Sequence, residues 1–316
     1  MLRIFVTQPL LGNAIERLRA VGTVEVNPDS RTILPKAQLI EAVRGCDILC
    51  CLLHDRVDSE VIDAAPSLVM ISDGAINPTN VNVTRARERG IVVANIPNIV
   101  AETTADMQWA LLLAVARRVV EADRALRSGL FPGGQSLHFA GATVAGKTFG
   151  SIGYGAIGRF SAKRAHGFGM RVLYSKPRRL SADEEAADGI EYRSLDDLLR
   201  ESDFVAINAA YGPETHHLIG ARELALMKPG AYIINTSRGL IIDESALVRA
   251  LVEGKVAGAG LDVFENEPSV HPDLLHFDNV VLTPHLGSAS VDTRIAIADC
   301  IADNVLAFMN SQQKLQ

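Results

Sequence analysis

One segment of the chain has the glycine spacing that allows a backbone to approach phosphate groups closely. It follows the β-rich run Thr148–Ile152, begins a helical pattern, and comprises Gly153, Tyr154, Gly155, Ala156, Ile157 and Gly158. In this spacing one glycine forms a tight turn, one admits a pyrophosphate, and one lets the helix pack against the strand. The free N–H groups and partial positive charge at the helix N-terminus also favour phosphate. The segment therefore predicts a dinucleotide-binding site, with a chance glycine turn as the alternative.

The end of the next strand indicates which dinucleotide is preferred. Enzymes that bind NAD usually have an acidic residue there, which accepts a hydrogen bond from the ribose 2′-hydroxyl. This chain instead has Ser175, followed by the cations Lys176, Arg178 and Arg179. Such cations suit a 2′-phosphate, because they supply charge-assisted and bidentate donors. The sequence predicts a preference for NADP(H) over NAD(H), unless these cations form only a solvated basic loop.

Three polar segments in the second half of the chain have an order and spacing that match a known family. The segments are Asn235–Gly239, Gly260–Pro268 and Thr283–Ala289. Together with the glycine motif they resemble the D-isomer-specific 2-hydroxyacid dehydrogenases, which include glyoxylate/hydroxypyruvate reductases, D-lactate dehydrogenases and phosphoglycerate dehydrogenases. The resemblance covers nearly the whole chain. It implies an NAD(P)-dependent oxidoreductase that moves a hydride between its cofactor and the 2-carbon of a small 2-oxo or 2-hydroxy acid.

Three residues in these segments suit the reduction of a 2-oxo acid. Arg238 is permanently charged and presents planar donors that match a carboxylate. His285 can give or take a proton near neutral pH, and Glu267 can orient its imidazole by accepting a hydrogen bond from the other ring nitrogen. The resemblance assigns the same roles to these residues. We also expect Thr236 in the cofactor site, and the resemblance implies that Asp262 accepts a hydrogen bond from the nicotinamide carboxamide.

The substrate pocket is expected to include Leu53, His54, Ile76 and Asn77 in addition to Arg238. In the family, a loop after the third strand usually contains a Val-Gly-aromatic-Asp pattern, whose N–H groups hold the substrate carboxylate. Here Asn77 stands at the glycine and Thr79 at the aspartate, and Pro78 removes a backbone donor. Asparagine tolerates a left-handed conformation better than most residues, so we expect the loop to keep its shape. His54 has a second interpretation as a packed loop histidine.

Short β-rich runs alternate with helical patterns from end to end of the chain, which is typical of α/β proteins with parallel sheets. We expect two doubly wound domains with the active site in the cleft between them. A flavodoxin-like substrate domain would comprise residues 1–98 and 287–316, and a Rossmann cofactor domain residues 99–286. One long helix at Thr103–Leu126, with Trp109 and a broad apolar face, resembles the family's dimer contact and predicts a homodimer. Phe131 lies where relatives place a tryptophan that reaches toward the neighbouring subunit's site.

Composition limits the remaining classes of partner. The chain has 316 residues, of which 48% are hydrophobic and 22% charged, and its net charge is −6. This balance argues against nucleic acid or an anionic membrane as the main partner. The lack of a charged leader and of a long apolar run predicts a cytoplasmic protein. The four cysteines are too few and too badly spaced for a disulfide framework, and Cys50 and Cys51 fit small buried hydrophobes in a strand. The histidine pairs His216/His217 and His271/His276 lack ligand spacing, so we expect no metal.

The most specific expectation is NADP(H)-dependent reduction of glyoxylate or hydroxypyruvate. Within the family, an NAD-dependent dehydrogenase of the D-lactate or phosphoglycerate type stays open, as does a relative that oxidises formate or phosphite. Glu267 argues against formate oxidation, because relatives with that activity pair the histidine with glutamine. A non-catalytic, dinucleotide-sensing binding protein of the same fold is the alternative from another class. Turnover of any 2-oxo acid would exclude it.

Overall fold

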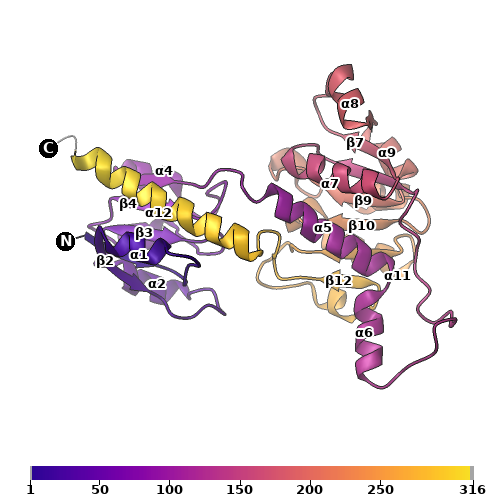
Figure 1. Ribbon diagram of the computed structural model, residues 1–316, viewed down its shortest axis with the longest axis horizontal. Coiled ribbons are helices and arrows are strands. Elements are labelled where there is room, and N and C mark those ends of the chain that lie inside the picture. The colour runs from indigo at the N-terminus through magenta and orange to yellow at the C-terminus, as the bar shows by residue number, and fades with distance from the viewer. Residues whose placement is uncertain (1, 314–316) are drawn as a thin grey trace. The chain divides into compact units, whose positions relative to one another are not determined.

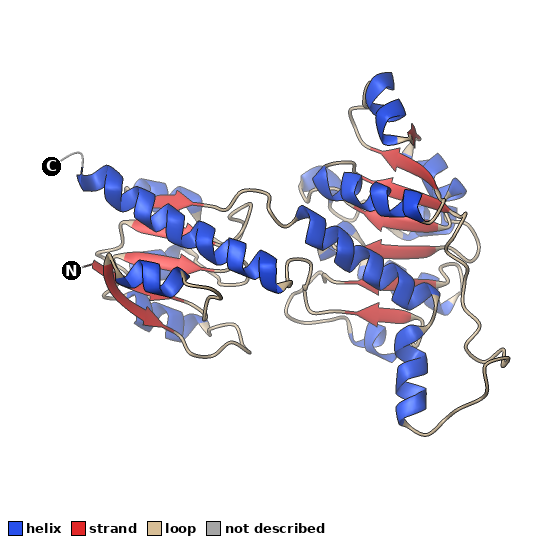
Figure 2. Ribbon diagram, viewed as in Figure 1, coloured by secondary structure: helices blue, strands red, loops and turns tan. Residues whose placement is uncertain are grey.

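The computed structural model describes residues 2–313, which form two compact units. One unit is built from the chain up to Ile99 and from Ala289 onward, and the other spans Val100–Ser288. We call them the five-stranded unit and the seven-stranded unit after their sheets. Every strand pair within the two sheets is parallel, and helices lie on both faces (Figure 2). The predicted α/β class with two parallel sheets is therefore confirmed.

The five-stranded unit has its strands in the order β2-β1-β3-β4-β5 (Figure 1). The strands are β1 (Leu2–Val6), β2 (Gly22–Val26), β3 (Ile48–Cys51), β4 (Met70–Asp73) and β5 (Val92–Ala94). The helices are α1 (Ala14–Arg19), α2 (Lys36–Val43), α3 (Ser59–Asp63), α4 (Val83–Glu88) and α12 (Val291–Gln313). Every residue of β3 is buried, as expected for a strand covered on both faces. Because α12 packs against α1 and β4, the end of the chain completes this unit.

Cys50 and Cys51 are buried as the strand pattern predicted, whereas Cys300 in α12 is partly exposed. Cys50 and Cys51 lie in β3, and both side chains are buried. Burial raises the pKa of each thiol, and it raises the pKa of Cys46 to about 12. These thiols therefore stay protonated near neutral pH and pack as small apolar side chains.

The seven-stranded unit has the order β12-β11-β10-β9-β6-β7-β8. Its strands are β6 (Thr148–Ile152), β7 (Arg171–Ser175), β8 (Ile190–Tyr192), β9 (Phe204–Ile207), β10 (Tyr232–Asn235), β11 (Gly258–Leu261) and β12 (Val280–Leu282). The strand order reverses beside β6, and in open sheets ligands bind at such a point, outside the carboxyl ends of the strands. The edge strand β8 was not predicted; it is three residues long, and only its first residue, Ile190, is buried.

The helices of this unit are α5 (Ala101–Ala116), α6 (Val119–Arg127), α7 (Ala156–Gly167), α8 (Ala182–Asp188), α9 (Leu195–Glu201), α10 (Ala221–Leu226) and α11 (Glu244–Val252). Short 3₁₀ turns occur at η1 (Pro213–Thr215), η2 (Gly239–Ile241) and η3 (Pro272–His276). None of the helices among residues 2–313 combines the length and the apolar character that crossing a membrane requires. The face of α5 that carries Trp109 is buried, and its indole ring stacks on Phe149 of β6 at 5.7 Å between ring centroids.

The prediction of one helix from Thr103 to Leu126 is wrong, because α5 and α6 are separate helices. Arg118 lies between them with a φ of 54°, a left-handed conformation that interrupts a right-handed helix. Its guanidinium binds both carboxylate oxygens of Glu121 and the carbonyl of His138. The Ala142 N–H donates to the carbonyl of Ala116 at 2.8 Å, which satisfies the end of α5. The amphipathic pattern spans both helices, so periodicity alone did not reveal the break.

Candidate active site

The glycine motif joins β6 to α7, and each glycine has a separate physical reason. Gly153 has a φ of +87°, and a Cβ there would lie 2.5 Å from the backbone nitrogen of Ala209. A Cβ on Gly158 would lie 3.2 Å from the hydroxyl of Ser151, so this glycine lets α7 pack on β6. A Cβ on Gly155, which precedes the first turn of α7, would meet nothing within 4 Å. The open space and free N–H groups at the start of α7 therefore fit the pyrophosphate of a dinucleotide.

The cations after β7 have different surroundings. Arg179 forms two hydrogen bonds of 2.7 Å with Glu185, and its guanidinium lies 5.3 Å from the centre of the Tyr192 ring. Arg179 and then Tyr174 hold the pKa of Glu185 at about 2, so the ion pair persists at all working pH values. In this structure Arg179 thus binds Glu185 in the first turn of α8. Its predicted role as a phosphate ligand would require it to leave this partner.

The other residues at this strand end lie nearer to the glycine motif. The carbonyl of Ser175 accepts a hydrogen bond from the Gly153 N–H at 2.7 Å. The ammonium of Lys176 lies 3.5 Å from the carbonyl of Tyr154, and Arg178 is exposed. Lys176 is therefore better placed than Arg179 to supply positive charge at this end of the site, and Arg178 is exposed two residues further on.

Glu267 and His285 form the hydrogen-bonded pair that the sequence analysis expected. Nδ1 of His285 and Oε2 of Glu267 are 2.9 Å apart, and the two side chains are 17% and 22% exposed. The second carboxylate oxygen accepts a hydrogen bond from the Phe264 N–H at 3.0 Å. With Nδ1 facing the carboxylate, Nε2 is the ring nitrogen that can exchange a proton with a substrate.

The turn that carries His285 is fixed by Asp262, which directly follows β11. Oδ1 accepts hydrogen bonds from the Thr283 hydroxyl at 2.6 Å and the Leu286 N–H at 2.7 Å, and Oδ2 accepts one from the Gly287 N–H at 2.8 Å. These bonds stabilise a φ of 57° at His285, which is costly for a residue with a Cβ. The carboxylate is 0% exposed. The predicted contact of Asp262 with a nicotinamide carboxamide stays a prediction, because the carboxylate can accept about four hydrogen bonds and the His285 turn supplies three.

Arg238 follows β10 in a turn held by Asn235. The Asn235 amide donates to the carbonyl of Arg238 at 2.9 Å, and its oxygen accepts from the Ser237 N–H at 3.0 Å. The guanidinium donates to the Ser237 carbonyl at 2.7 Å. Burial lowers the pKa of Arg238, while the negative charge of Glu267 acts in the opposite direction. The side chain keeps its positive charge, which partial burial makes more effective toward an anion.

The Arg238 turn and the Glu267 turn pack directly on each other. A Cβ on Gly239 would lie 1.9 Å from the backbone carbon of Phe264, so only glycine fits between the two segments. The arginine and the histidine–glutamate pair therefore belong to one closely packed surface of the seven-stranded unit.

Sequence reasoning missed a group of buried polar side chains beneath this surface. The hydroxyl of Thr236, an expected cofactor residue, accepts a hydrogen bond from the amide of Gln108 at 3.2 Å. Gln108 in α5 is 0% exposed, and it also binds Asn208 and Ser161. The available signal was a long polar side chain next to Trp109 on the buried face of a predicted helix.

The five-stranded unit holds the other expected substrate residues in two neighbouring loops. Leu53 and His54 follow β3, and Ile76 and Asn77 follow β4; His54 and Asn77 are exposed. The amide of Asn80 joins the loops, donating to the carbonyls of Leu52 at 3.1 Å and Asp55 at 3.3 Å. Sequence reasoning missed Asn80. Among residues 2–313, the positive φ values outside glycine belong to Arg118, His217 and His285, so Asn77 does not use the expected left-handed conformation.

Two buried carboxyl groups lie under these loops. Asp55 accepts hydrogen bonds from the Leu52 N–H at 2.7 Å and from the Thr7 hydroxyl. Asp73, at the end of β4, accepts from the Asn80 amide at 3.4 Å through Oδ1, and its buried Oδ2 has no hydrogen-bond partner among the described residues. Burial raises the pKa of Asp73 to about 6. The loop that carries Asn77 therefore rests on a carboxyl group that is poorly solvated.

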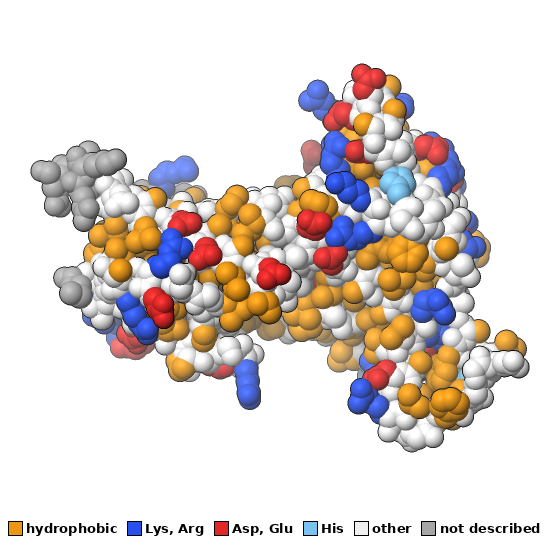
Figure 3. Space-filling view, viewed as in Figure 1, with side chains coloured by type: hydrophobic (Ala, Val, Ile, Leu, Met, Phe, Trp, Pro, Cys, Tyr) orange, Lys and Arg blue, Asp and Glu red, His pale blue; other side chains and the backbone are white. Residues whose placement is uncertain are grey.

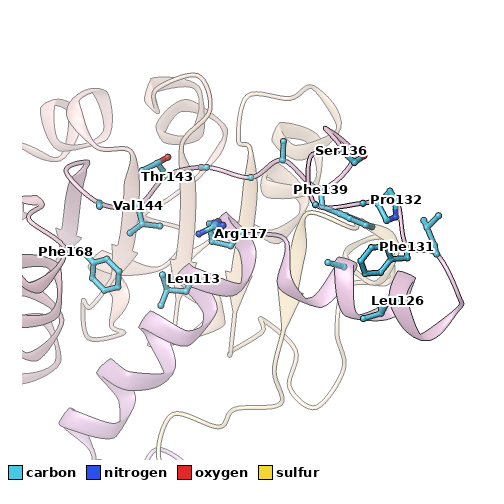
Figure 4. Close-up of a pocket in the computed structure, with 18 residues that line it drawn as sticks. Leu113, Arg117, Leu126, Phe131, Pro132, Ser136, Phe139, Thr143, Val144 and Phe168 are labelled. Carbon is cyan, nitrogen blue, oxygen red and sulfur yellow. The ribbon is translucent and has the colours of Figure 1, made fainter.

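Residues 128–145, which we call the arm, carry exposed apolar side chains. Phe131 is 78% exposed and Leu137 86% exposed, and apolar side chains gather over α6 and the arm (Figure 3). Between the arm and the helices α5 and α6 lies a hollow of about 690 Å³ (Figure 4). Its lining includes Leu113, Leu126, Phe139 and Val144. Exposed apolar surface of this kind marks an interaction site in soluble proteins.

Comparison with known proteins identifies relatives over nearly the whole chain. Residues 109–287 match the model of the NAD-binding domain of D-isomer-specific 2-hydroxyacid dehydrogenases. A glyoxylate reductase of Thermococcus gammatolerans is 45% identical over 315 residues, covering 98% of this chain and 93% of the relative. An NADPH-dependent glyoxylate/hydroxypyruvate reductase of Sinorhizobium meliloti, solved with NADP and malonate, is 32% identical with a TM-score of 0.80, covering 98% of this chain and 93% of that one. A D-lactate dehydrogenase of Aquifex aeolicus, solved with NAD and lactic acid, is 26% identical with a TM-score of 0.81, covering 99% and 96%.

Proposed function

The chain belongs to the D-isomer-specific 2-hydroxyacid dehydrogenases, and we propose that it reduces glyoxylate or hydroxypyruvate with NADPH as the preferred reductant. Membership of the family makes the protein an NAD(P)-dependent oxidoreductase that acts on a 2-hydroxy or 2-oxo acid. The observation that carries the proposal is the Glu267–His285 hydrogen bond on the surface that also bears Arg238. The identity to glyoxylate reductases supports the choice of a small substrate.

The dinucleotide fits the residues at the start of α7. Gly155 leaves open space where a phosphate would approach, and α7 directs its first N–H groups there. When bound, the reduced nicotinamide supplies the hydride that adds to the 2-carbon of the substrate. The remaining work is to hold the carboxylate and to protonate the oxygen on that carbon.

His285 is the proton donor in this proposal. Protonated imidazole donates from Nδ1 to Glu267 and presents the Nε2–H to the carbonyl oxygen of the substrate. As the hydride adds to the 2-carbon, the Nε2 proton moves to that oxygen and leaves a neutral ring. Glu267 stabilises the imidazolium and fixes the ring plane, because its carboxylate is itself held by the Phe264 N–H. The reverse direction, oxidation of the alcohol, begins with the neutral ring.

Arg238 would bind the carboxylate of the substrate and polarise the carbonyl beside it. Its half-buried guanidinium matches a carboxylate in shape and charge. Leu53, His54, Ile76 and Asn77 of the five-stranded unit are proposed as further substrate contacts. The loop after β4 differs in sequence from the family pattern at Asn77 and Thr79. We therefore expect this loop to affect substrate preference more than it affects the chemical step.

Preference for NADPH is proposed from the residues that follow β7. Ser175 supplies no negative charge against a 2′-phosphate, and Lys176 and Arg178 supply positive charge nearby. A relative that shares the fold was solved with NADP, and another was solved with NAD, so the residues of this chain must decide the preference.

The protein is also proposed to form a homodimer in which a second copy covers the arm. Burial of Phe131 and Leu137 would remove apolar surface from water, at about 25 cal/mol for each Å². Sedimentation analysis of the wild type should give a dimer, and Leu137→Asp together with Phe131→Asp should give a monomer. A wild type that sediments as a monomer at micromolar concentration would reject this assembly.

Initial rates of NADPH and NADH oxidation test the activity. The panel is glyoxylate, hydroxypyruvate, pyruvate and an aromatic 2-oxo acid. We expect the highest kcat/KM with NADPH and either glyoxylate or hydroxypyruvate. Faster turnover of pyruvate with NADH would instead favour a dehydrogenase of the D-lactate type. Tight NADPH binding with no turnover of any acid would favour a dinucleotide-sensing binding protein.

A further inference from the structure

Gln108 makes three hydrogen bonds from a fully buried position in α5. Its Nε2 donates to Oδ1 of Asn208 at 3.0 Å and to the hydroxyl of Thr236 at 3.2 Å, and its Oε1 accepts from the hydroxyl of Ser161 at 2.6 Å. The side chain is 0% exposed. Its amide therefore ties α5 to the carboxyl ends of β9 and β10 and to α7.

The hydrogen bonds continue from Asn208 to the glycine motif. The amide of Asn208 donates to the Ser151 hydroxyl at 2.9 Å, and that hydroxyl donates to the carbonyl of Gly153 at 2.6 Å. Each group in this series accepts on one side and donates on the other, from Gln108 through Asn208 and Ser151 to Gly153. We call these four residues the Gln108 relay. Such chains of hydrogen bonds have one consistent direction and strengthen each other at low dielectric.

The last acceptor of the relay is the carbonyl of Gly153, which belongs to the peptide that joins Gly153 to Tyr154 in the glycine motif. The hydrogen bond to this carbonyl therefore fixes the orientation of that peptide plane. In a trans peptide the C=O of one residue and the N–H of the next point in opposite directions. Ser151 holds the carbonyl of Gly153 on the side of α7, where it would lie 3.3 Å from a Cβ on Gly158, so the N–H of Tyr154 points to the opposite side of this peptide plane. Gly155 follows there, with open space where its Cβ would be.

A second hydrogen bond from Gln108, outside the relay, leads toward Arg238, which is expected to bind the substrate carboxylate. Thr236, which accepts from Gln108, is two residues before Arg238 in the chain. The hydroxyl of the intervening Ser237 donates to the carbonyl of Ala209 at 2.5 Å, and Ala209 directly follows Asn208. The ends of β9 and β10 are thus joined twice, once through Gln108 and once through Ser237.

We propose that Gln108 is a positioning residue for the dinucleotide site, which holds the Gly153–Tyr154 peptide in its phosphate-binding orientation through Asn208 and Ser151. It touches neither cofactor nor substrate in this role. An apolar side chain of the same size would fill the same volume but would leave Asn208, Thr236 and Ser161 without their buried partner. The proposal rests on dinucleotide binding by the seven-stranded unit, which the family assignment establishes, and is independent of the 2-oxo acid used.

The test is the dissociation constant for NADPH and NADH, measured by quenching of Trp109 fluorescence or by calorimetry, together with the Tm of each variant. Gln108→Leu should raise the dissociation constant of the better-bound cofactor about tenfold at 25 °C. Ser151→Ala, a smaller change at the other end of the relay, should raise it in the same direction. The double variant should lose less than the product of the two single losses, because both act through one series of bonds.

Thr104→Val is the matched control. Thr104 is also a buried polar residue of α5, one turn before Gln108, but its hydroxyl donates to the Val100 carbonyl at the start of that helix. We expect this variant to lower the Tm without changing the dissociation constant. A folded Gln108→Leu or Ser151→Ala variant that binds the cofactor within twofold of wild type would overturn the proposal, and so would losses that multiply fully in the double variant. If wild type bound neither nucleotide, the dinucleotide site itself would be rejected, not only the role of Gln108.

Discussion

The two units support their functional loops in different ways. In the seven-stranded unit, the buried carboxylate of Asp262 accepts three hydrogen bonds from the His285 turn, and both of its oxygens are used. In the five-stranded unit, the buried carboxyl of Asp73 under the Asn77 loop leaves one oxygen without a partner among the described residues. Proton transfer requires a fixed geometry, and the hydrogen bonds to Asp262 fix the His285 turn. The carboxyl group under the Asn77 loop has fewer hydrogen bonds, so that loop is held less firmly. We infer that changes in the first region lower kcat, and also lower stability where they leave a buried donor unpaired, and that changes in the second region affect KM or stability.

His285→Ala should give the largest effect of any single change. It removes the proton donor, so kcat should fall between about 10²-fold and 10⁴-fold, while the dissociation constant of NADPH stays within about twofold. Steady-state kinetics and cofactor titration on the same preparation measure both quantities. Glu267→Gln is the graded comparison: its amide oxygen can still accept from Nδ1 of His285, but its NH₂ then faces the Phe264 N–H, and the charge that stabilises the imidazolium is lost. A His285→Ala variant with near wild-type kcat would remove the basis of the proposed mechanism.

Asp262→Asn should give the next largest effect, and on stability as well as rate. Whichever way the amide is turned, its NH₂ replaces an acceptor and faces at least one donor of the His285 turn. We expect a loss of about 1–3 kcal/mol in the free energy of unfolding, the usual cost of leaving a buried donor unpaired, with a parallel fall in kcat. Urea unfolding and initial rates provide the two measurements. A variant with unchanged stability and a weakened cofactor would instead favour the predicted contact with the nicotinamide carboxamide.

Asp73→Asn should stabilise the protein, in contrast to Asp262→Asn. Burial raises the pKa of Asp73 from an ordinary value of 3.8 to about 6, so the folded protein binds this proton more tightly than the unfolded chain. The free energy of unfolding therefore falls as pH rises from about 4 to about 6 and is constant above that range, by at most about 3 kcal/mol. Asparagine is neutral at every pH and avoids this loss.

Unfolding of wild type and Asp73→Asn at pH 4 and pH 7.5 measures the effect. The variant should exceed wild type at pH 7.5 and approach it at pH 4. Asp58→Asn is the control, because Asp58 is a partly exposed helix cap of the same unit whose pKa is lowered, chiefly by its hydrogen bond to Lys36. Equal destabilisation of Asp73→Asn at both pH values would mean that the lost hydrogen bonds outweigh the charge.

The sequence was sufficient where one local pattern determines one local structure. The glycine motif predicted the β6–α7 turn, and the alternating segments predicted both parallel sheets. The pairing of Glu267 with His285 was expected from two separate polar segments, which follow the neighbouring parallel strands β11 and β12. The sequence was insufficient where distant segments contribute, as at the break at Arg118, whose guanidinium donates to the carbonyl of His138, 20 residues further along the chain. Gln108 is the clearest example, because its partners lie 53, 100 and 128 residues away along the chain.

The smallest expected effect concerns the rim of the cofactor site, where two neighbouring arginines differ in their partners. Arg178 is exposed, whereas both donors of Arg179 are engaged by Glu185. Arg178→Ala should therefore raise the KM for NADPH about tenfold, equivalent to about 1.4 kcal/mol, and leave the KM for NADH nearly unchanged. Arg179→Ala should change the ratio of the two KM values by less than about threefold and act mainly by loosening α8. Equal effects of the two substitutions on the ratio of the KM values for NADPH and NADH would show that Arg179 leaves Glu185 to bind the 2′-phosphate. The ion pair with Glu185 would then not fix this edge of the cofactor site.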